Sequence, residues 1–376
     1  MGKNVLRNLK LTENNHNVMI YQNLWKQWSS CGKIIFRKSK SLQQSHFISQ
    51  ATGMGRFKVY VTHPNVPQSA IQLLQESCDV TVWQQECPVK RAELMTQIKG
   101  KDALFCLLTD KIDKDVLDSA GPDLKVIGTM SVGYDHIDVH EVKKRGIKIG
   151  YTPDVLTDAV ADLTVALLLA TSRRLFESHN EILKGQWGPW SPLWMCGPAL
   201  KGSTIGMVGY GRIGRATARR LVAFGVGRTH YWGRSDHGDP DNIGAKFCPE
   251  LTNLLAESDF VVVTCALTTD THEMFDEKAF AVMKPSAVFI NTSRGGVVKQ
   301  DALIKALETK QIWAAGLDVT TPEPLSPDHP LLSLRNCVVI PHIGSATTQA
   351  RTEMAMLTAR NILAALNGEP LPAEIK

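Results

Sequence analysis

The sequence lacks any long apolar run. A membrane-spanning helix needs about 18 or more consecutive apolar, uncharged residues, and the 376 residues contain no such stretch. The nearest case, residues 155–172, is interrupted by Asp158 and Asp162. We therefore expect no membrane partner, and the length predicts two or three globular domains.

Cysteine motifs are also absent. The eight cysteines are scattered, none forms a C-x-x-C pair, and no Cys/His cluster has the spacing of a zinc site. Cys106 and Cys265 lie in apolar, strand-like runs, where a reduced cysteine behaves as a small core residue. We expect no metal and a reducing compartment, which favours a cytoplasmic protein over a secreted one.

Acids are nearly missing from residues 1–55, which hold eight Lys or Arg and a single acid, Glu13. The rest of the chain carries a net charge of −2, so no basic field predicts a nucleic-acid partner. We expect residues 1–55 to form a basic, disordered arm. Its Ser-rich composition is typical of a mitochondrial presequence, with an untargeted tail as the alternative. Met54 offers another start just before the first strand.

From Phe57 onward, short β-branched runs alternate with helical stretches. This alternation is typical of parallel strands joined by crossover helices, and it predicts an α/β fold. The expected strands are 58–62, 80–83, 103–107, 125–128 and 148–150, then 204–208, 228–232, 260–264, 287–290, 314–317 and 337–340. A closing helix is expected at 345–367, ended by Gly368.

One long helix is predicted between the two series of strands. It begins near Thr157 or Asp158, either of which can cap it, and runs to about Lys184. Its residues are apolar almost continuously from Val160 to Ala170. A helix that is apolar on most sides is buried on most sides, so it joins domains or packs against another subunit, unless it is an ordinary core helix.

A glycine motif opens the second series. Gly209, Gly211 and Gly214 form G-x-G-x-x-G between strand 204–208 and a helix that contains Arg212 and Ile213. The first glycine permits a tight turn, the second lets the backbone approach a pyrophosphate, and the third allows close helix–strand packing. Phosphates bind to the free N–H groups at such a helix N-terminus. The motif therefore predicts dinucleotide binding.

The residues after strand 228–232 indicate which dinucleotide. An NAD site usually offers Asp or Glu there to the ribose 2′-hydroxyl. This chain instead has Gly233, Arg234 and Ser235, and its first carboxylate is Asp236. Arg234 can face a 2′-phosphate, with Ser235 as a second donor. This pattern favours NADP, with an exposed arginine beside an adapted NAD site as the alternative.

Three segments place reactive side chains just after predicted strands. N-T-S-R-G-G carries Arg294, D-V-T-T-P-E-P carries Glu323 and P-H-I-G-S carries His342. Ligands of open α/β sheets bind outside the carboxyl ends of the strands. We therefore expect one cation, one carboxylate and one imidazole to converge at that edge of the sheet.

These motifs, in this order and spacing, resemble those of the D-isomer-specific 2-hydroxyacid dehydrogenases, and within them most closely the glyoxylate/hydroxypyruvate reductases. The resemblance covers residues 57–376. It includes T-M-S-V-G-Y-D-H at 129–136, G-Y-T-P at 150–153 and the Trp-rich segment 187–194. The N-terminal arm has no counterpart in the family pattern.

The resemblance implies two Rossmann-like or flavodoxin-like parallel-sheet domains with a cleft between them. Residues 56–155 and 346–376 would form a discontinuous substrate domain. Residues 156–345 would form the dinucleotide-binding domain. The resemblance also implies a homodimer that forms through the dinucleotide-binding domain.

The implied reaction is NADPH-dependent reduction of small 2-oxo acids: glyoxylate to glycolate and hydroxypyruvate to D-glycerate, with NADH as the weaker cofactor. Such a reduction needs a proton donor, and we expect His342 to fill this role while Glu323 orients its ring. Arg294 is expected to bind the substrate carboxylate and carbonyl oxygen as a planar fork. The resemblance assigns the same three roles.

By similarity, other residues also contact the ligands. Backbone N–H groups near Val132 and Gly133 would bind the substrate carboxylate. Trp190 would reach the substrate pocket of the partner subunit, or simply pack at the interface. Asp318 would lie at the nicotinamide end of the cofactor. The further cofactor contacts implied in this way are Ser293 and Gly344.

Two alternative functions fit the same residues. One is another D-2-hydroxyacid dehydrogenase, of the phosphoglycerate or D-lactate type, because a sequence does not measure the pocket that selects the substrate. The other is a nucleotide-sensing, corepressor-like binding protein of the same fold, in which the Arg, Glu and His set is retained. The Trp-rich segment and Arg234 favour the reductase.

Overall fold

The computed structural model describes residues 55–376. The predictions for the N-terminal arm, including the presequence, fall outside these residues. Within them, no helix has both the length and the apolar character needed to cross a membrane.

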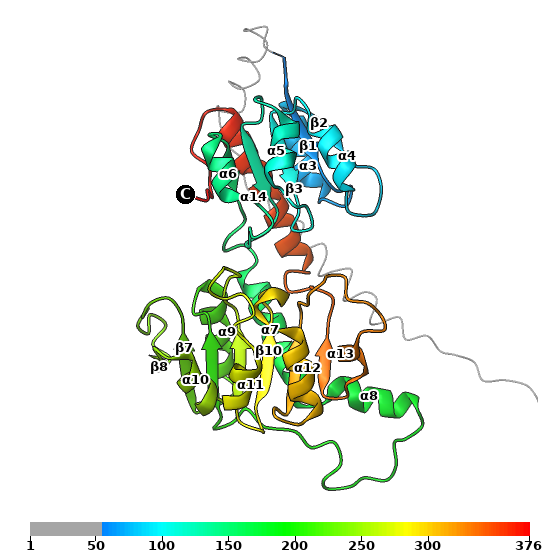
Figure 1. Cartoon of the computed structure of the whole chain (residues 1–376), viewed down its shortest axis with the longest axis vertical. Helices are drawn as coiled ribbons and strands as arrows, with labels where there is room; N and C mark the ends of the chain where they lie inside the picture. The colour runs from blue at the N-terminus through cyan, green and yellow to red at the C-terminus, as the bar shows by residue number, and fades with distance from the viewer. Residues whose placement is uncertain (1–54) are drawn as a thin grey trace, which may run out of the picture. The chain divides into compact units, whose positions relative to one another are not determined.

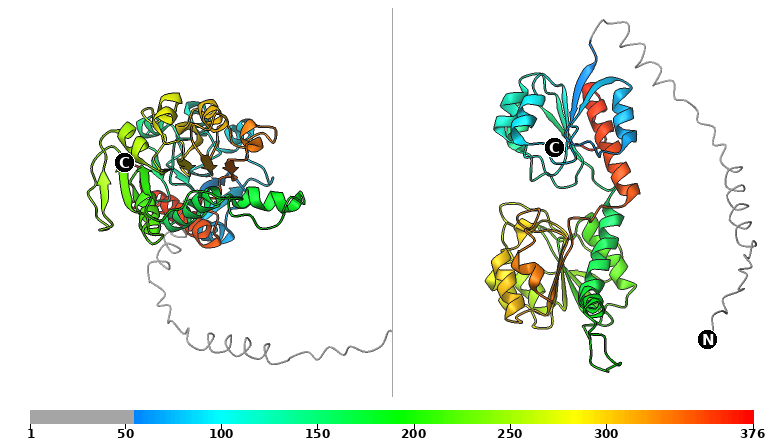
Figure 2. Two further views of the ribbon diagram at one scale, coloured as in Figure 1. Left: turned by 90° about the horizontal axis from the view of Figure 1, so that it is seen from below. Right: turned by 90° about the vertical axis from the view of Figure 1, so that its right-hand side faces the viewer.

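The first sheet has five parallel strands in the order β2-β1-β3-β4-β5, the flavodoxin-like order. Its strands are β1 (Phe57–Val61), β2 (Cys78–Val82), β3 (Ala103–Cys106), β4 (Val126–Thr129) and β5 (Lys148–Gly150). Helices pack on both faces, so the central strands are buried and apolar throughout. The covering helices are α3 (Gln68–Gln75) and α14 (Thr348–Leu366) on one face, and α4 (Arg91–Gln97), α5 (Lys114–Ala120) and α6 (Val139–Lys144) on the other (Figure 2).

Helix α14 returns from the end of the chain to the first sheet. The Thr347 hydroxyl caps it by accepting a hydrogen bond from the Ala350 N–H at 3.1 Å. Gly368, with φ of +75°, follows its last turn. Ala355 and Ile362 are fully buried against the core of the first sheet. The predicted closing helix and its terminating glycine are confirmed.

The second sheet has seven parallel strands in the order β12-β11-β10-β9-β6-β7-β8, the doubly wound order with β6 at its switch point. Its strands are β6 (Thr204–Val208), β7 (Arg228–Trp232), β8 (Ala245–Phe247), β9 (Phe260–Val263), β10 (Val288–Asn291), β11 (Ala314–Leu317) and β12 (Cys337–Val339). The three-residue edge strand β8 was not predicted. The predicted class, α/β with two parallel-sheet domains, is confirmed.

Helices also cover both faces of this sheet (Figures 1 and 2). The helices on one face are α7 (Thr157–Ser172) and α9 (Arg212–Val222); those on the other are α10 (Leu251–Glu257), α11 (Glu277–Val282) and α12 (Gln300–Glu308). Helix α8 (Leu175–Leu183) follows α7, and the short α13 (Pro330–Ser333) precedes β12. All the predicted site residues after strands therefore emerge at the carboxyl edge.

The single long helix predicted from Thr157 to Lys184 is wrong, because the structure divides it into α7 and α8. Arg174 takes the left-handed conformation, with φ of 55°, and its guanidinium donates two hydrogen bonds of 2.8 Å to Glu177. Gly197 also packs against the carbonyl of Ser172, where a Cβ would lie 1.9 Å from the oxygen. The close approach of Gly197 and the local Arg174–Glu177 ion pair therefore end the helix at Ser172, where its sequence pattern predicts that it continues.

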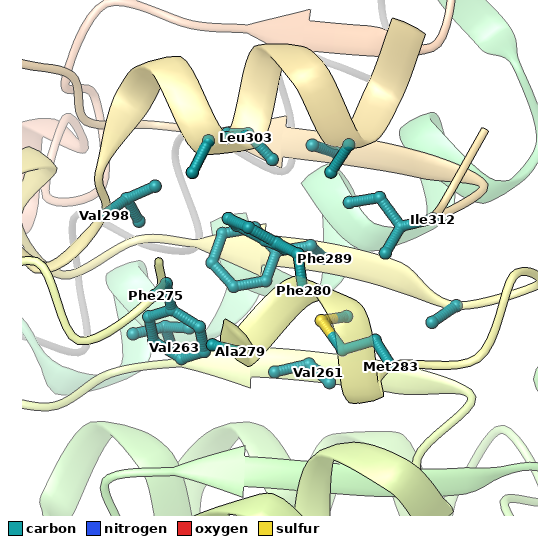
Figure 3. Close-up of a cluster of buried hydrophobic side chains, with 14 of the residues drawn as sticks. Val261, Val263, Phe275, Ala279, Phe280, Met283, Phe289, Val298, Leu303 and Ile312 are labelled. Atoms are coloured by element: carbon teal, nitrogen blue, oxygen red, sulfur yellow. The ribbon is translucent and has the colours of Figure 1, made fainter. Parts of the chain in front are cut away.

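Three phenylalanines fill the core on the α11–α12 side of the second sheet (Figure 3). The ring centroid of Phe289 lies 4.9 Å from that of Phe275 and 5.5 Å from that of Phe280, both edge to face. All three are fully buried. An edge-to-face pair of rings stabilises the fold by about 0.5–1.5 kcal/mol beyond the free energy gained from burying the apolar area of the rings.

Phe289→Ala should lower the free energy of unfolding by about 3–5 kcal/mol, because it leaves a cavity between packed rings. Urea denaturation of the two proteins measures the change. Phe224→Ala is the matched control, because Phe224 is 47% exposed; we expect it to cost less than about 1 kcal/mol. Equal losses in the two variants would contradict the central role of the phenylalanine cluster.

Candidate active site

The glycine motif forms a tight turn between β6 and α9. Gly209 has φ of +94°, and a Cβ there would lie 2.6 Å from the Cys265 nitrogen. A Cβ on Gly214 would lie 2.3 Å from the Gly209 carbonyl oxygen. No protein atom lies within 4 Å of a Cβ built on Gly211, and no side chain caps α9. Its N-terminal N–H groups are therefore open to an anionic ligand, which fits the phosphates of a dinucleotide.

The side chains of Arg212 and Ile213 have other contacts. Arg212 forms an ion pair with Asp154, with Nε 2.5 Å from Oδ1. Ile213 packs against the core of the first sheet. These two residues would therefore serve a dinucleotide through their backbone N–H groups.

The loop after β7 carries an available cation. Arg234 and Ser235 are exposed, and the Arg234 side chain forms no ion pair with any carboxylate in residues 55–376. The first carboxylate of the loop, Asp236, accepts hydrogen bonds from the Tyr231 hydroxyl and from the Gly238 N–H, the latter at 2.8 Å. The available cation and the engaged carboxylate fit a 2′-phosphate better than a 2′-hydroxyl.

Asn291 organises the turn that presents Arg294. It is fully buried, and its Oδ1 accepts hydrogen bonds from the Ser293 N–H at 3.0 Å and hydroxyl at 2.8 Å. Its Nδ2 donates to the Arg294 carbonyl at 2.9 Å. The Ser293 hydroxyl is thus engaged inside the turn, and Asn291 is a supporting residue that the sequence reasoning missed.

Arg294 joins a loop of the second sheet to a loop of the first. Its Nε donates to Asp135 Oδ1 at 2.9 Å, and its Nη1 donates to the Ser293 carbonyl at 2.9 Å. A Cβ on Gly133 would lie 1.8 Å from Nη2, so only glycine permits this approach. Asp135 was part of a recognised motif, but no sequence signal linked it to Arg294.

Glu323 and His342 form the predicted pair. The His342 Nδ1 lies 2.7 Å from the Glu323 Oε2, and both side chains are partly exposed. Glu323 Oε1 also accepts a hydrogen bond from the Thr320 N–H at 3.0 Å. Burial opposes ionisation of Glu323, but its hydrogen bond with His342 and the nearby charges outweigh burial, and the pKa of Glu323 lies below its usual value. An ionised Glu323 makes Nδ1 the donor and leaves the His342 Nε2 for a ligand.

Asp318 holds the backbone that carries His342. Its two carboxylate oxygens accept hydrogen bonds from the Ile343 N–H at 2.7 Å and the Gly344 N–H at 2.8 Å. Its carbonyl accepts from the His342 N–H at 2.9 Å. Burial raises the pKa of Asp318, although these N–H groups oppose the shift. Asp318 and Gly344 are therefore in direct contact, and both have structural contacts within the loop.

The predicted carboxylate-binding segment is held from beneath. The buried Ser131 hydroxyl donates to the Gly133 carbonyl at 2.7 Å, and the Thr129 hydroxyl lies 2.7 Å from that of Ser131. His136 Nε2 lies 3.0 Å from the Thr129 hydroxyl. Burial lowers the pKa of His136 to about 4, so its ring is neutral at pH 7. This chain of hydrogen bonds fixes the backbone of Val132 and Gly133 beside Arg294.

Trp190 is a predicted site residue that the structure does not bring to the other predicted site residues. Its side chain is 84% exposed, in the segment that follows α8. It therefore has little contact with its own subunit, and its role at a partner's pocket stays a prediction. In residues 55–376, no group of three or more His, Cys, Asp or Glu side chains is placed to hold a metal ion.

Comparison with known proteins agrees with the family resemblance that the sequence motifs indicate. Residues 165–344 match the NAD binding domain of the D-isomer specific 2-hydroxyacid dehydrogenases. A glyoxylate reductase/hydroxypyruvate reductase from Mus musculus is 52% identical over 321 residues, and one from Homo sapiens is 50% identical over 323; each match covers 85% of this chain and 98% of the relative.

A solved structure is also similar over the same region. It is the crystal structure of an NADPH-dependent glyoxylate/hydroxypyruvate reductase from Sinorhizobium meliloti in complex with NADP and malonate. That protein is 30% identical, with a TM-score of 0.75, and the match covers 85% of this chain and 97% of the other. The predicted resemblance and the predicted binding of a nicotinamide dinucleotide are both confirmed. The chain belongs to the D-isomer specific 2-hydroxyacid dehydrogenase family, and it is an oxidoreductase with that family's NAD binding domain.

Proposed function

We propose that this enzyme uses NADPH to reduce glyoxylate to glycolate and hydroxypyruvate to D-glycerate. The observation that carries the proposal is the meeting of the Arg294 guanidinium with Gly133 at the edge that also holds the Glu323–His342 pair. The activities named for the similar reductases support the choice of substrates. We further propose residues 56–155 with 346–376 as the substrate domain and 156–345 as the dinucleotide-binding domain.

The chain's own residues would hold and protonate the substrate. Arg294 already donates through Nε and one Nη1 hydrogen to Asp135 and to its neighbour's carbonyl, so its remaining N–H groups bind the oxo acid as a fork. The N–H groups near Val132 and Gly133 bind the same carboxylate. When bound on the glycine turn, NADPH supplies the hydride for C2 of the substrate. The His342 Nε2 then gives a proton to the carbonyl oxygen.

His342→Ala should lower kcat by about 10²- to 10⁴-fold, because it removes the proton donor. The dissociation constant for NADPH should stay near the wild-type value. Steady-state kinetics and fluorescence titration measure the two effects. His140→Ala is the control, because His140 is exposed on α6. Near-full turnover in His342→Ala would remove this histidine from the mechanism.

Steady-state turnover with NADPH and NADH, against both oxo acids, tests the function as a whole. NADPH-dependent reduction of glyoxylate and hydroxypyruvate is expected. A preference for NADH or for larger acids would favour another D-2-hydroxyacid dehydrogenase. Tight nucleotide binding without turnover would favour the corepressor-like alternative.

Arg234→Ala should weaken NADPH about 10- to 100-fold, the range for losing a charge-assisted hydrogen-bonding partner, and change NADH little. Titration of both nucleotides measures the difference. Arg228→Ala, an exposed arginine at the other end of β7, is the matched control. Equal weakening of the two nucleotides would exclude Arg234 from a 2′-phosphate site.

We also propose that two chains form a homodimer through residues 175–194. Eight large apolar side chains of this segment are at least 42% exposed, including Leu183, Trp190 and Leu193. Monomers rarely leave such a concentration of apolar surface in water. A cavity of about 970 Å³ lies beside α8, and its lining includes both apolar side chains, such as Phe176, and charged ones, such as Glu177 and Lys184. A second copy of the chain is the proposed occupant.

The double variant Leu183→Asp, Leu193→Asp should convert the dimer to a monomer, because two charges would be buried without partners at the interface. Val282→Asp, which changes an exposed apolar residue on α11, should leave the dimer intact. Sedimentation velocity distinguishes the species. A monomeric wild-type protein would contradict the proposal.

A further inference from the structure

The loop of residues 233–244 connects β7 and β8 and contains three carboxylates. Each of the three has a hydrogen-bond or ion-pair partner within the protein. Asp236 binds the Tyr231 hydroxyl and the Gly238 N–H. Asp239 accepts from the Ile243 and Gly244 N–H groups, at 3.1 and 2.6 Å. Asp241 pairs with two arginines of α9, Arg215 at 2.8 Å and Arg219 at 2.7 Å. Arg234 alone among the charged side chains of this loop is left without such a partner in residues 55–376.

Tyr231 holds Asp236 from inside the domain. The tyrosine is fully buried on β7, and its ring stacks on that of Tyr210 with centroids 4.1 Å apart and planes 14° apart. Its hydroxyl donates to the Asp236 carboxylate and accepts from the His237 N–H at 3.0 Å. The hydrogen bond from Tyr231 is the largest cause that lowers the pKa of Asp236, so this carboxylate keeps its charge.

A free Asp236 would work against a 2′-phosphate. It lies two residues from Arg234 on the same exposed loop. Unrestrained, it would pair with the Arg234 guanidinium and occupy the cation, or accept a hydrogen bond from a ribose 2′-hydroxyl and repel a phosphate at that position. In the structure its Oδ1 is held by the Tyr231 hydroxyl and the Gly238 N–H, and it forms no ion pair with Arg234 in residues 55–376.

We propose that Tyr231 is a specificity-determining positioning residue: its hydroxyl holds Asp236 away from Arg234 and so favours a nucleotide with a 2′-phosphate over one with a 2′-hydroxyl. This inference rests on the NADPH preference in the proposed function. Tyr231 acts through Asp236 and Arg234, because its own side chain is buried beneath the loop.

The test uses adenosine 2′,5′-bisphosphate and adenosine 5′-monophosphate, two fragments that differ only in the 2′-phosphate. Calorimetry on the full chain gives the ratio of their dissociation constants without any turnover. Tyr231→Phe should reduce the preference for the 2′-phosphate by about tenfold, the effect of one nearby like charge at intermediate dielectric. In the Asp236→Asn background, the same change should leave the preference within about twofold.

Two further variants keep the test sharp. Tyr60→Phe is the matched control, because Tyr60 is also buried and its hydroxyl has no hydrogen-bond partner among the described residues; it should not change the ratio. Asp236→Asn alone keeps the acceptor for Tyr231 and should also leave the ratio within about twofold. A large rise in Asp236→Asn would mean that Asp236 already opposes the phosphate, and would overturn the proposal even if Tyr231→Phe fails to fold.

The remaining outcomes separate this inference from the proposed function. Equal weakening of both nucleotides in Tyr231→Phe would reduce Tyr231 to a support for the loop and overturn the inference alone. An unchanged ratio in a folded Tyr231→Phe protein would do the same. A wild-type protein without a preference for the 2′-phosphate would overturn the NADPH preference, and the inference with it.

Discussion

The geometry of the site depends on the hydrogen bonds that the buried carboxylate of Asp318 accepts. A carboxylate out of water requires hydrogen-bond donors, and here the donors are the N–H groups of Ile343 and Gly344. These two hydrogen bonds hold the backbone of His342 in a left-handed conformation, with φ of 52°. Glu323, in the loop that begins with Asp318, then meets the ring. One loop thus anchors the imidazole and supplies its partner.

Most of the fold was predictable because short β-branched or apolar runs alternate with helical stretches, the pattern of parallel strands joined by crossover helices. The runs at 148–150, 204–208, 228–232 and 314–317 are strands with those bounds. The edge strand Ala245–Phe247 is too short to carry a pattern. One of the two contacts at the division between α7 and α8 is made by Gly197, which is distant in sequence and meets Ser172 only in the folded chain.

The positions of Arg294, Glu323 and His342 at one edge of the sheet were predictable, because each residue follows a strand. The supporting residues were not predictable, because their roles depend on contacts across the chain. Asn291 is an ordinary amide until its buried hydrogen bonds with the Ser293–Arg294 turn are seen. Asp135 is 159 residues from the arginine that it binds. Spacing along a sequence carries no information on such contacts.

The contacts of Arg294 also have an entropic consequence. A free arginine side chain has about 2 kcal/mol of rotamer entropy to lose when it is held in one geometry. In this fold, Asp135 and the Ser293 carbonyl already restrain the guanidinium, and Gly133 lets it lie against the backbone. Much of that loss therefore occurs when the chain folds, so the proposed substrate, a small acid with few contacts of its own, would meet a guanidinium that is already restrained.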